Sequence, residues 1–346
     1  MLKSPFNNLT NKGSIFAISW PETLIYKTTA WYDTVTTIMG FCKNGYYSVG
    51  HAALLLVEYT TGKVYYFDFG RYQSPVGYGR VRDMYSDPEL EIKTSAVIID
   101  NKIQNIEAIL SEVYNNNATH GDGRLMTSLT NNIDFDCAYS KAKEIQSRGA
   151  VPYGPFKYKG SNCSRFIASV YMPGIKNIFQ KLRINISYLY CKTPTSNIIA
   201  TSRVNQVFVI KSGKFYIENS KINMFFSNKT TTKPTVSNNN HSQIPKNALK
   251  LYGIGCSSYF EVNATKNKSL FDIKSYNEQG GLEFAKTFQM LTLGFDINHP
   301  FTIAYISNAL SVKIKQRDRI FEFKCTNKVI TPISNFKLKV LKNKNH

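Results

Sequence analysis

Apolar positions in the first half of the chain predict a buried sheet. Residues 48–59 (SVGHAALLLVEY) are apolar almost without interruption, which is typical of a strand buried on both faces at the centre of a sheet. Residues 63–72 (KVYYFDFGRY) predict its partner strand, and the Thr-Thr-Gly between the two runs predicts a hairpin turn. Shorter apolar runs predict further strands at residues 14–20 and 90–92.

Apolar residues spaced three and four positions apart predict four helices in the same half of the chain. They cover residues 23–42, 103–114 and 134–148, and the stretch that begins at Cys163. Residues 176–204 have little period of either kind, and Pro194 interrupts them. We therefore expect an irregular end to a first domain at residue 204.

The second part of the chain has a different pattern, in which short apolar runs alternate with Gly and Asn. The predicted strands cover residues 206–210, 214–217, 258–262, 271–273, 301–305, 311–314 and 320–323. Residues 227–245 have almost no apolar side chains and predict a flexible tract. The predicted fold class is therefore α+β, with a first domain over 1–204 and a small, mostly-β domain over 205–346, a sandwich or a barrel.

Composition places the chain among globular proteins. Its 346 residues are 42% hydrophobic, enough for two domains with a core each. The six cysteines are scattered without a CxxC pair, which favours free thiols in a reducing compartment and predicts no disulfide framework and no zinc site. No run approaches the roughly 18 apolar residues of a membrane span. We expect a soluble cytoplasmic protein that needs no cofactor or metal.

The net charge of +20 is concentrated in the C-terminal part. Residues 1–200 carry 21 Lys and Arg against 15 Asp and Glu, whereas residues 201–346 carry 22 against 8. Basic surfaces attract nucleic acid and anionic lipid. The one tight cluster alternates along a predicted strand and would share a solvated face; it consists of Lys313, Lys315, Arg317 and Arg319. Because the other charges are dispersed, we favour solubility over recognition as their role.

A cysteine lies where a polar loop runs into a helix, in the sequence GSNCSRFIASVY. Ser161 or Asn162 can cap this helix, which leaves Cys163 at the positive end of the helix dipole. Such a position favours the thiolate, the nucleophilic form of the side chain. The simpler interpretation, a small buried hydrophobic residue at a helix start, explains these residues equally well.

The predicted base is a histidine at the head of the central strand. His51 begins an apolar run, and a rigid strand holds geometry better than the loop around His120, the other histidine considered. The group that orients the imidazole stays open between two residues. A two-residue turn would place Tyr72 opposite His51 and Asp68 about 13 Å away, but a carboxylate is the better chemical type. A one-residue slip would bring Gln73 to the same place, and Arg71 or Arg80 could pair with Asp68.

Five short motifs in this order resemble a known superfamily. GHAALLLVE, FDFGRY, GYGRVRD, THGDG and YGPF–GSNCSRF are similar to the circularly permuted papain-like cysteine hydrolases, which include the NlpC-type YiiX-like proteins and the lecithin:retinol acyltransferase group. They resemble most closely an uncharacterised family of bacterial proteins, mainly from Bacteroidetes. The resemblance covers residues 14–175 and implies Cys163 as nucleophile and His51 as base. The acyltransferase group has a histidine near the position of Tyr72, so the orienting residue differs here.

The predicted function is a cysteine hydrolase or acyltransferase acting on an amide, ester or thioester, with a peptide or another acyl compound as substrate. The predicted substrate-binding residues flank the site; they are Asn162, Tyr153, Phe156 and His120. The alternative is a binding module without catalysis, whose basic C-terminal half engages nucleic acid or anionic lipid.

Overall fold

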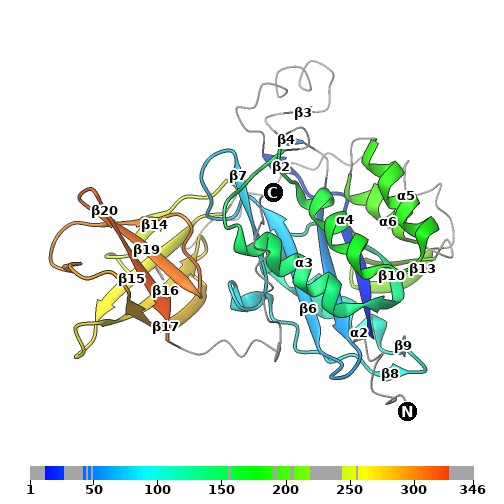
Figure 1. The fold of residues 1–346 in the computed structure, drawn as a ribbon, viewed down its shortest axis with the longest axis horizontal. Helices are drawn as coiled ribbons and strands as arrows, with labels where there is room; N and C mark the ends of the chain where they lie inside the picture. The colour runs from blue at the N-terminus through cyan, green and yellow to red at the C-terminus, as the bar shows by residue number, and fades with distance from the viewer. Residues whose placement is uncertain are drawn as a thin grey trace, which may run out of the picture.

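An eight-stranded sheet with helices on both faces fills the first part of the chain, and a seven-stranded sheet fills the second (Figure 1). The structure is a computed structural model. It describes residues 12–26, 42–43, 46–47, 50–154, 157–189, 193–202, 206–218, 244–254 and 256–326.

The first sheet is antiparallel throughout. Its order is β11 (Val151–Pro152), β7 (Tyr78–Arg82), β6 (Val64–Gly70), β5 (His51–Glu58), β1 (Lys12–Trp20), β10 (Leu125–Asp134), β12 (Val207–Lys211) and β13 (Lys214–Glu218). Strand β5 lies between β6 and β1, and all eight of its residues are buried. The prediction of a central strand from its apolar run is confirmed.

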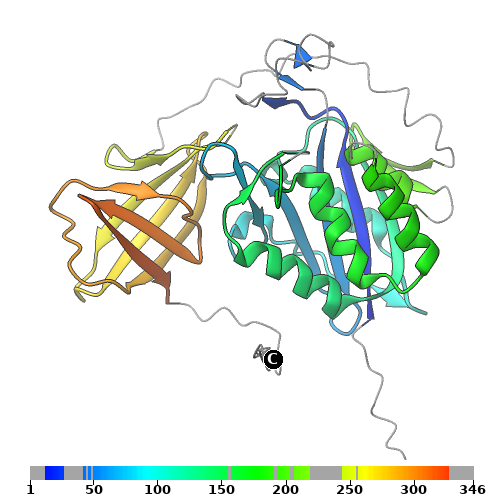
Figure 2. The same cartoon turned by 45° about the horizontal axis from the view of Figure 1, so that its top comes forward.

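Alternate residues of β5 face two different layers of helices. Ala52, Leu54 and Leu56 face a cluster formed with α3 (Phe135–Ser147), α4 (Cys163–Gly174) and α6 (Pro194–Thr201). The residues between them pack with α2 (Ile106–Asn115) on the opposite face. Helix α5 (Ile178–Leu189) lies against α6, as Figure 2 shows. A strand with two apolar faces is thus covered on both sides.

The prediction of irregular structure over residues 176–204 is wrong, because α5 and α6 lie there. Pro194 starts α6 instead of interrupting a segment: it occupies the first turn, where its missing N–H costs nothing. Thr193 and Ser196 form a capping box around it. Helix α5 exposes Ile178, Phe179 and other apolar side chains, so its apolar residues do not follow the spacing of a single buried face.

Three other predictions in the first domain differ from the structure. Strand β10 was not predicted, because its sequence LMTSLTNNID is rich in polar residues; the buried hydroxyl of Thr127 is satisfied by the carbonyl of Ala17. The segment around residue 90 is the 3-10 helix η1 (Pro88–Leu90), which a proline starts. The predicted helix over 23–42 begins instead with β2 (Ile25–Tyr26), which pairs with β4 (Tyr46–Tyr47), and β4 pairs in turn with β3 (Cys42–Lys43). Residues 27–41 lie outside the described residues.

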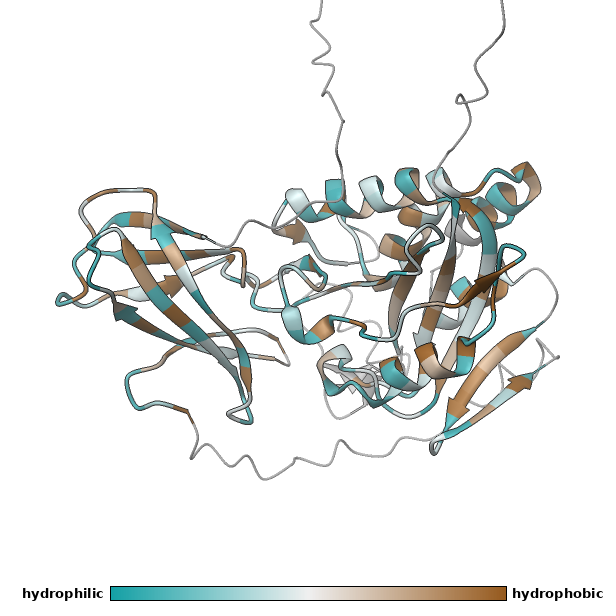
Figure 3. Cartoon of the chain, turned by 90° about the horizontal axis from the view of Figure 1, so that it is seen from below, coloured by the Kyte–Doolittle hydropathy of each residue, from teal (hydrophilic) through white to brown (hydrophobic). Residues whose placement is uncertain are grey.

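The second sheet curls into a nearly closed seven-stranded antiparallel β-barrel. Its strand order is β14 (Leu249–Leu251), β15 (Ser258–Ala264), β16 (Leu270–Asn277), β17 (Leu282–Met290), β20 (Arg319–Cys325), β19 (Ser311–Gln316) and β18 (Thr302–Ala304), with β14 lying against β18. Hydrophobic and hydrophilic residues alternate along its strands (Figure 3), and the inward set forms a separate core rich in phenylalanine. The predicted fold class, α+β followed by a small β domain, is confirmed.

Strands β12 and β13 form the predicted hairpin but belong to the first sheet. Leu125, Met126 and Thr127 of β10 pair with β12, so these strands extend the first domain beyond residue 204. Buried side chains of β12, such as Val207 and Val209, join the core under α6. The apolar pattern of residues 206–217 predicts two strands but does not indicate which of the two sheets they join.

Little of the basic charge lies on the barrel itself. Residues 248–326 carry ten Lys and Arg against seven Asp and Glu. Lys313 and Lys315 lie on β19, but Arg317 lies in the turn that follows and Arg319 begins β20, so the four do not share one strand. Residues 227–243 of the predicted flexible tract lie outside the described residues. An anionic partner stays a prediction.

Candidate functional site

Cys163 is the first residue of α4. The side chain of Asn162 caps the helix by accepting a 2.8 Å hydrogen bond from the N–H of Arg165. Helix α4 packs against β5 and β6 through Phe166, Ile167 and Val170. Cys163 is consequently buried, with 5% of its surface exposed, at the end of the helix where free N–H groups gather.

His51 is the first residue of β5, directly after a glycine that the geometry requires. Gly50 has φ +75°, and a Cβ there would lie 2.7 Å from the carbonyl oxygen of Trp20. This close approach lets β5 begin beside the end of β1, where the rings of His51 and Trp20 stack with centroids 5.6 Å apart. The imidazole is thereby buried and held in one orientation.

Asp68 and Tyr72 both contact His51, at the same ring nitrogen. Nε2 of His51 lies 3.5 Å from Oδ2 of Asp68 and 3.3 Å from the hydroxyl of Tyr72. The Tyr72 hydroxyl also donates a 3.0 Å hydrogen bond to Asp68 Oδ2. The two residues that the sequence left as alternatives are brought together in one cluster.

The predicted distance of about 13 Å for Asp68 is wrong because the hairpin has a different register. Glu58 pairs with Lys63 across a four-residue loop, in place of the assumed two-residue turn. Asp68 therefore faces Ala53, two residues from His51 and on the same face of the sheet. The longer loop therefore sets a register in which the Asp68 carboxylate lies beside the His51 imidazole.

Arg82 is the partner of Asp68, where the sequence suggested Arg71 or Arg80. It lies opposite Asp68 on β7 and donates two hydrogen bonds to its carboxylate, of 3.0 and 2.6 Å. Its guanidinium also lies 3.5 Å from the centroid of the Tyr72 ring. The signal that was missed is the alternation of Arg80 and Arg82 along a strand, where both side chains are buried.

The charges around His51 favour its protonated form. Burial lowers the pKa of His51, but hydrogen bonding and negative charge at Asp68, and then at Cys163, raise it by more, to about 9. Burial raises the pKa of Asp68, and the guanidinium of Arg82 and the imidazole outweigh that effect and lower it below its usual range. Cys163 is thus one of the groups whose charge bears on the pKa of His51.

The other predicted residues lie in three different environments. Tyr153 stacks on Phe69 and forms a bridge with Ser161 in the cysteine loop. His120 is exposed and stacks on the Tyr72 ring, 5.5 Å between centroids. Gln73 hydrogen bonds to Ser258 of the barrel and to Arg80. Phe156 lies outside the described residues.

Two family matches divide the chain as the two folds do. Residues 15–178 match the family described as Type VI secretion system effector TseH-like. We refer to the first domain as the TseH-like domain because of this similarity. Residues 248–326 match the DUF6695 C-terminal domain, which corresponds to the barrel. No curated protein matches the chain.

The crystal structure of a Type VI secretion system effector, TseH, is distantly similar. It is 16% identical, with a TM-score of 0.39, and the alignment covers 60% of this chain and 98% of that chain. Within the described residues, no helix is long and apolar enough to cross a membrane.

A cavity of about 450 Å³ lies between the TseH-like domain and the barrel. Gln73, Arg82 and His120 line one wall, and Cys256, Asn277 and Glu283 line the other. Two of its lining residues, Arg82 and His120, contact the Tyr72 ring. In the part of the chain that the structure describes, no group of three or more His, Cys, Asp or Glu side chains could hold a metal ion.

The raised pKa of His51 predicts a pH-dependent stability of the TseH-like domain. The folded protein holds this proton up to about pH 9, whereas the unfolded chain releases it near pH 6.5. The free energy of unfolding should therefore fall between these pH values, by up to about 3 kcal/mol. Urea unfolding at a series of pH values measures it. The half-buried Glu89 acts in the same direction at lower pH, since loss of solvation raises its pKa to about 8. The His51→Gln variant isolates the histidine: an unchanged slope between pH 7 and 9 would contradict the assignment.

Proposed function

We propose that the chain is a thiol hydrolase in which Cys163 is the nucleophile, His51 the acid and base, and Asp68 and Tyr72 the groups that orient His51. The proposal rests on a buried histidine that a carboxylate contacts at 3.5 Å, together with a cysteine at a helix N-terminus that contributes to the raised pKa of this histidine. The order of histidine strand before cysteine helix supports the resemblance to permuted papain-like hydrolases.

In this proposal the two ring nitrogens of His51 have different tasks. Nε2 of His51 faces Asp68 and Tyr72, so Nδ1 is the nitrogen left to exchange a proton with Cys163. With a pKa of about 9, His51 is protonated at neutral pH, and this positive charge stabilises a thiolate beside it. The positive end of α4 acts in the same direction.

Hydrolysis then takes two steps. The Cys163 sulfur attacks the carbonyl carbon of an amide, ester or thioester, and the first N–H groups of α4 stabilise the oxyanion. The imidazolium gives its proton to the leaving nitrogen, oxygen or sulfur, which departs and leaves a thioester on Cys163. Neutral His51 next takes a proton from water, whose oxygen attacks the thioester, releasing the acid and restoring the thiol.

The family description extends the proposal to location. Because the matched family is described as Type VI secretion system effector TseH-like, we propose that the protein acts after delivery by a secretion system, and not in the cytoplasm as its cysteine content suggested. The nucleic-acid or lipid alternative has less support, since the barrel carries little of the basic excess.

Selective alkylation tests the proposed nucleophile without a known substrate. At pH 7, limiting iodoacetamide should label Cys163 first, because His51 and the helix terminus favour its thiolate. Cys137 is more exposed, but burial and the neighbouring Asp134 raise its pKa. Burial raises the pKa of Cys256 to about 12. Mass-spectrometric mapping measures the order of labelling, and His51→Ala should slow Cys163. Faster labelling of Cys137 in the folded protein would count against the proposal.

A further inference from the structure

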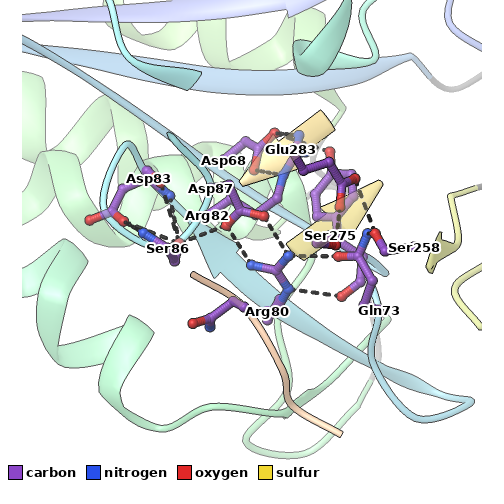
Figure 4. A network of polar contacts seen from close by, with 12 residues as sticks. Asp68, Gln73, Arg80, Arg82, Asp83, Ser86, Asp87, Ser258, Ser275 and Glu283 are labelled. Atoms are coloured by element: carbon purple, nitrogen blue, oxygen red, sulfur yellow. Dashed lines mark hydrogen bonds and ion pairs between the residues drawn. The ribbon is translucent and has the colours of Figure 1, made fainter. Parts of the chain in front are cut away.

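The barrel contacts the TseH-like domain through hydrogen bonds that lead to the catalytic cluster. The side chain of Gln73 donates a 2.9 Å hydrogen bond to the hydroxyl of Ser258 on β15 (Figure 4). Ser258 in turn donates to Glu283 on β17, at 3.0 Å, and the carboxylate of Glu283 also accepts from Ser275 on β16. Three neighbouring barrel strands thus fix the hydroxyl that receives Gln73.

A second contact reaches the same place from another part of the barrel. The N–H of Ala309 donates to the carbonyl of Ser86, at 3.0 Å. The Ser86 hydroxyl donates to Asp87, at 2.6 Å, and Asp87 forms a two-pronged ion pair with Arg80 at 2.6 and 2.7 Å. Arg80 is also bonded to the Gln73 side-chain oxygen, at 2.6 Å. Both routes from the barrel therefore meet at Arg80.

Arg80 connects these contacts of the barrel to Tyr72. Its Nε donates a 3.0 Å hydrogen bond to the carbonyl oxygen of Tyr72. Gln73 has φ +35°, an unfavourable conformation that its partners must hold. Gly70 lets the tyrosine ring fold back, because a Cβ there would lie 2.3 Å from the ring. The Tyr72 hydroxyl then reaches His51 and Asp68.

We propose that the C-terminal barrel is a positioning element of the hydrolase site, holding the Tyr72 hydroxyl against His51 through the Ser258–Gln73 contact and Arg80. That this positioning serves catalysis rests on the proposed function above. Because the Tyr72 hydroxyl donates to Asp68, its oxygen is free to accept the proton on His51 Nε2. Tyr72 therefore stabilises the imidazolium of His51 when its hydroxyl lies against Nε2, and it loses this effect when the hydroxyl is displaced.

The test measures the titration midpoint of His51 by NMR in protein with labelled histidines. Ser258→Ala removes one barrel hydroxyl, and Gln73→Met removes both contacts of the glutamine side chain. Each should lower the midpoint by about one pH unit, the scale of one hydrogen bond to a charged group. Neither variant alters the titratable and charged groups around His51, which are Tyr66, Asp68, Tyr72, Arg82, His120 and Cys163.

Ser269→Ala is the matched control, since it removes a hydroxyl bonded to Asn267 in an exposed turn of the barrel. It should leave the midpoint unchanged. If Ser258→Ala or Gln73→Met lowers the melting temperature while the His51 midpoint stays that of the control, the barrel only stabilises the fold and the proposal is wrong. If Ser258→Ala does not fold, Gln73→Met decides alone. The NMR titration needs no substrate. If the His51 midpoint shifts but the protein hydrolyses no ester, amide or thioester, the proposed function is wrong and the barrel still positions Tyr72.

Discussion

Replacing Cys163 by alanine should reduce hydrolysis of a small activated ester such as p-nitrophenyl acetate by at least about a thousandfold. Without the sulfur no acyl-enzyme can form, and water must attack directly, aided only by binding and the oxyanion site. The fold should tolerate the change, because a buried cysteine is a small apolar side chain and its loss costs about 1 kcal/mol. Release of p-nitrophenol measures the rate, and thermal unfolding verifies the fold.

Cys137→Ala is the matched control for this experiment. Cys137 also lies in the first turn of a helix, α3, and its N–H is capped by Asp134. It differs from Cys163 in having acidic neighbours, Asp134 and Asp136, which disfavour a thiolate. Its replacement should leave the rate within a factor of about two. Equal rates for Cys163→Ala and the unaltered protein would show that any hydrolysis comes from another group.

Local sequence signals were enough to predict where Cys163 and His51 lie. A capping asparagine, an apolar face and a polar loop define the start of α4 within a few residues. The uninterrupted apolar run of β5 predicts a central strand, and its first residue is consequently placed at the sheet end. Such features depend on neighbours in sequence, which explains why these two positions could be predicted.

The remaining parts of the site depend on pairings that the sequence does not encode locally. The loop between β5 and β6 is two residues longer than a tight turn, and this difference decides whether Asp68 reaches His51. The pair of Asp68 and Arg82 requires a third strand in register. The Gln73–Ser258 contact joins residues 185 positions apart. Polar strands such as β10 escape detection because their hydroxyls are satisfied only by tertiary contacts.

Asp68→Asn should destabilise the TseH-like domain by about 3–5 kcal/mol at pH 7, because it leaves the buried Arg82 without its counter-charge. Asp68 is fully buried and accepts hydrogen bonds from Tyr66, Tyr72 and Arg82. An asparagine of the same shape has no negative charge, and its two N–H groups would face these hydrogen-bond donors instead of accepting from them. Urea unfolding measures the loss. The same variant should lower the pKa of His51 from about 9, since Asp68 is the group that raises it most.

The pH dependence separates this effect from a general loss of packing. The lowered pKa of Asp68 contributes stability that is present above pH 4 and is lost as the pH falls toward the folded-state value. The difference in unfolding free energy between the variant and the unaltered protein should therefore narrow in acid. Glu144→Gln is the control, because Glu144 pairs with Lys141 and Arg148 on the exposed face of α3, where an ion pair contributes less than about 1 kcal/mol. A gap that stays constant down to pH 2 would mean that shape, and not the charge shared by Asp68, Arg82 and His51, holds this cluster together.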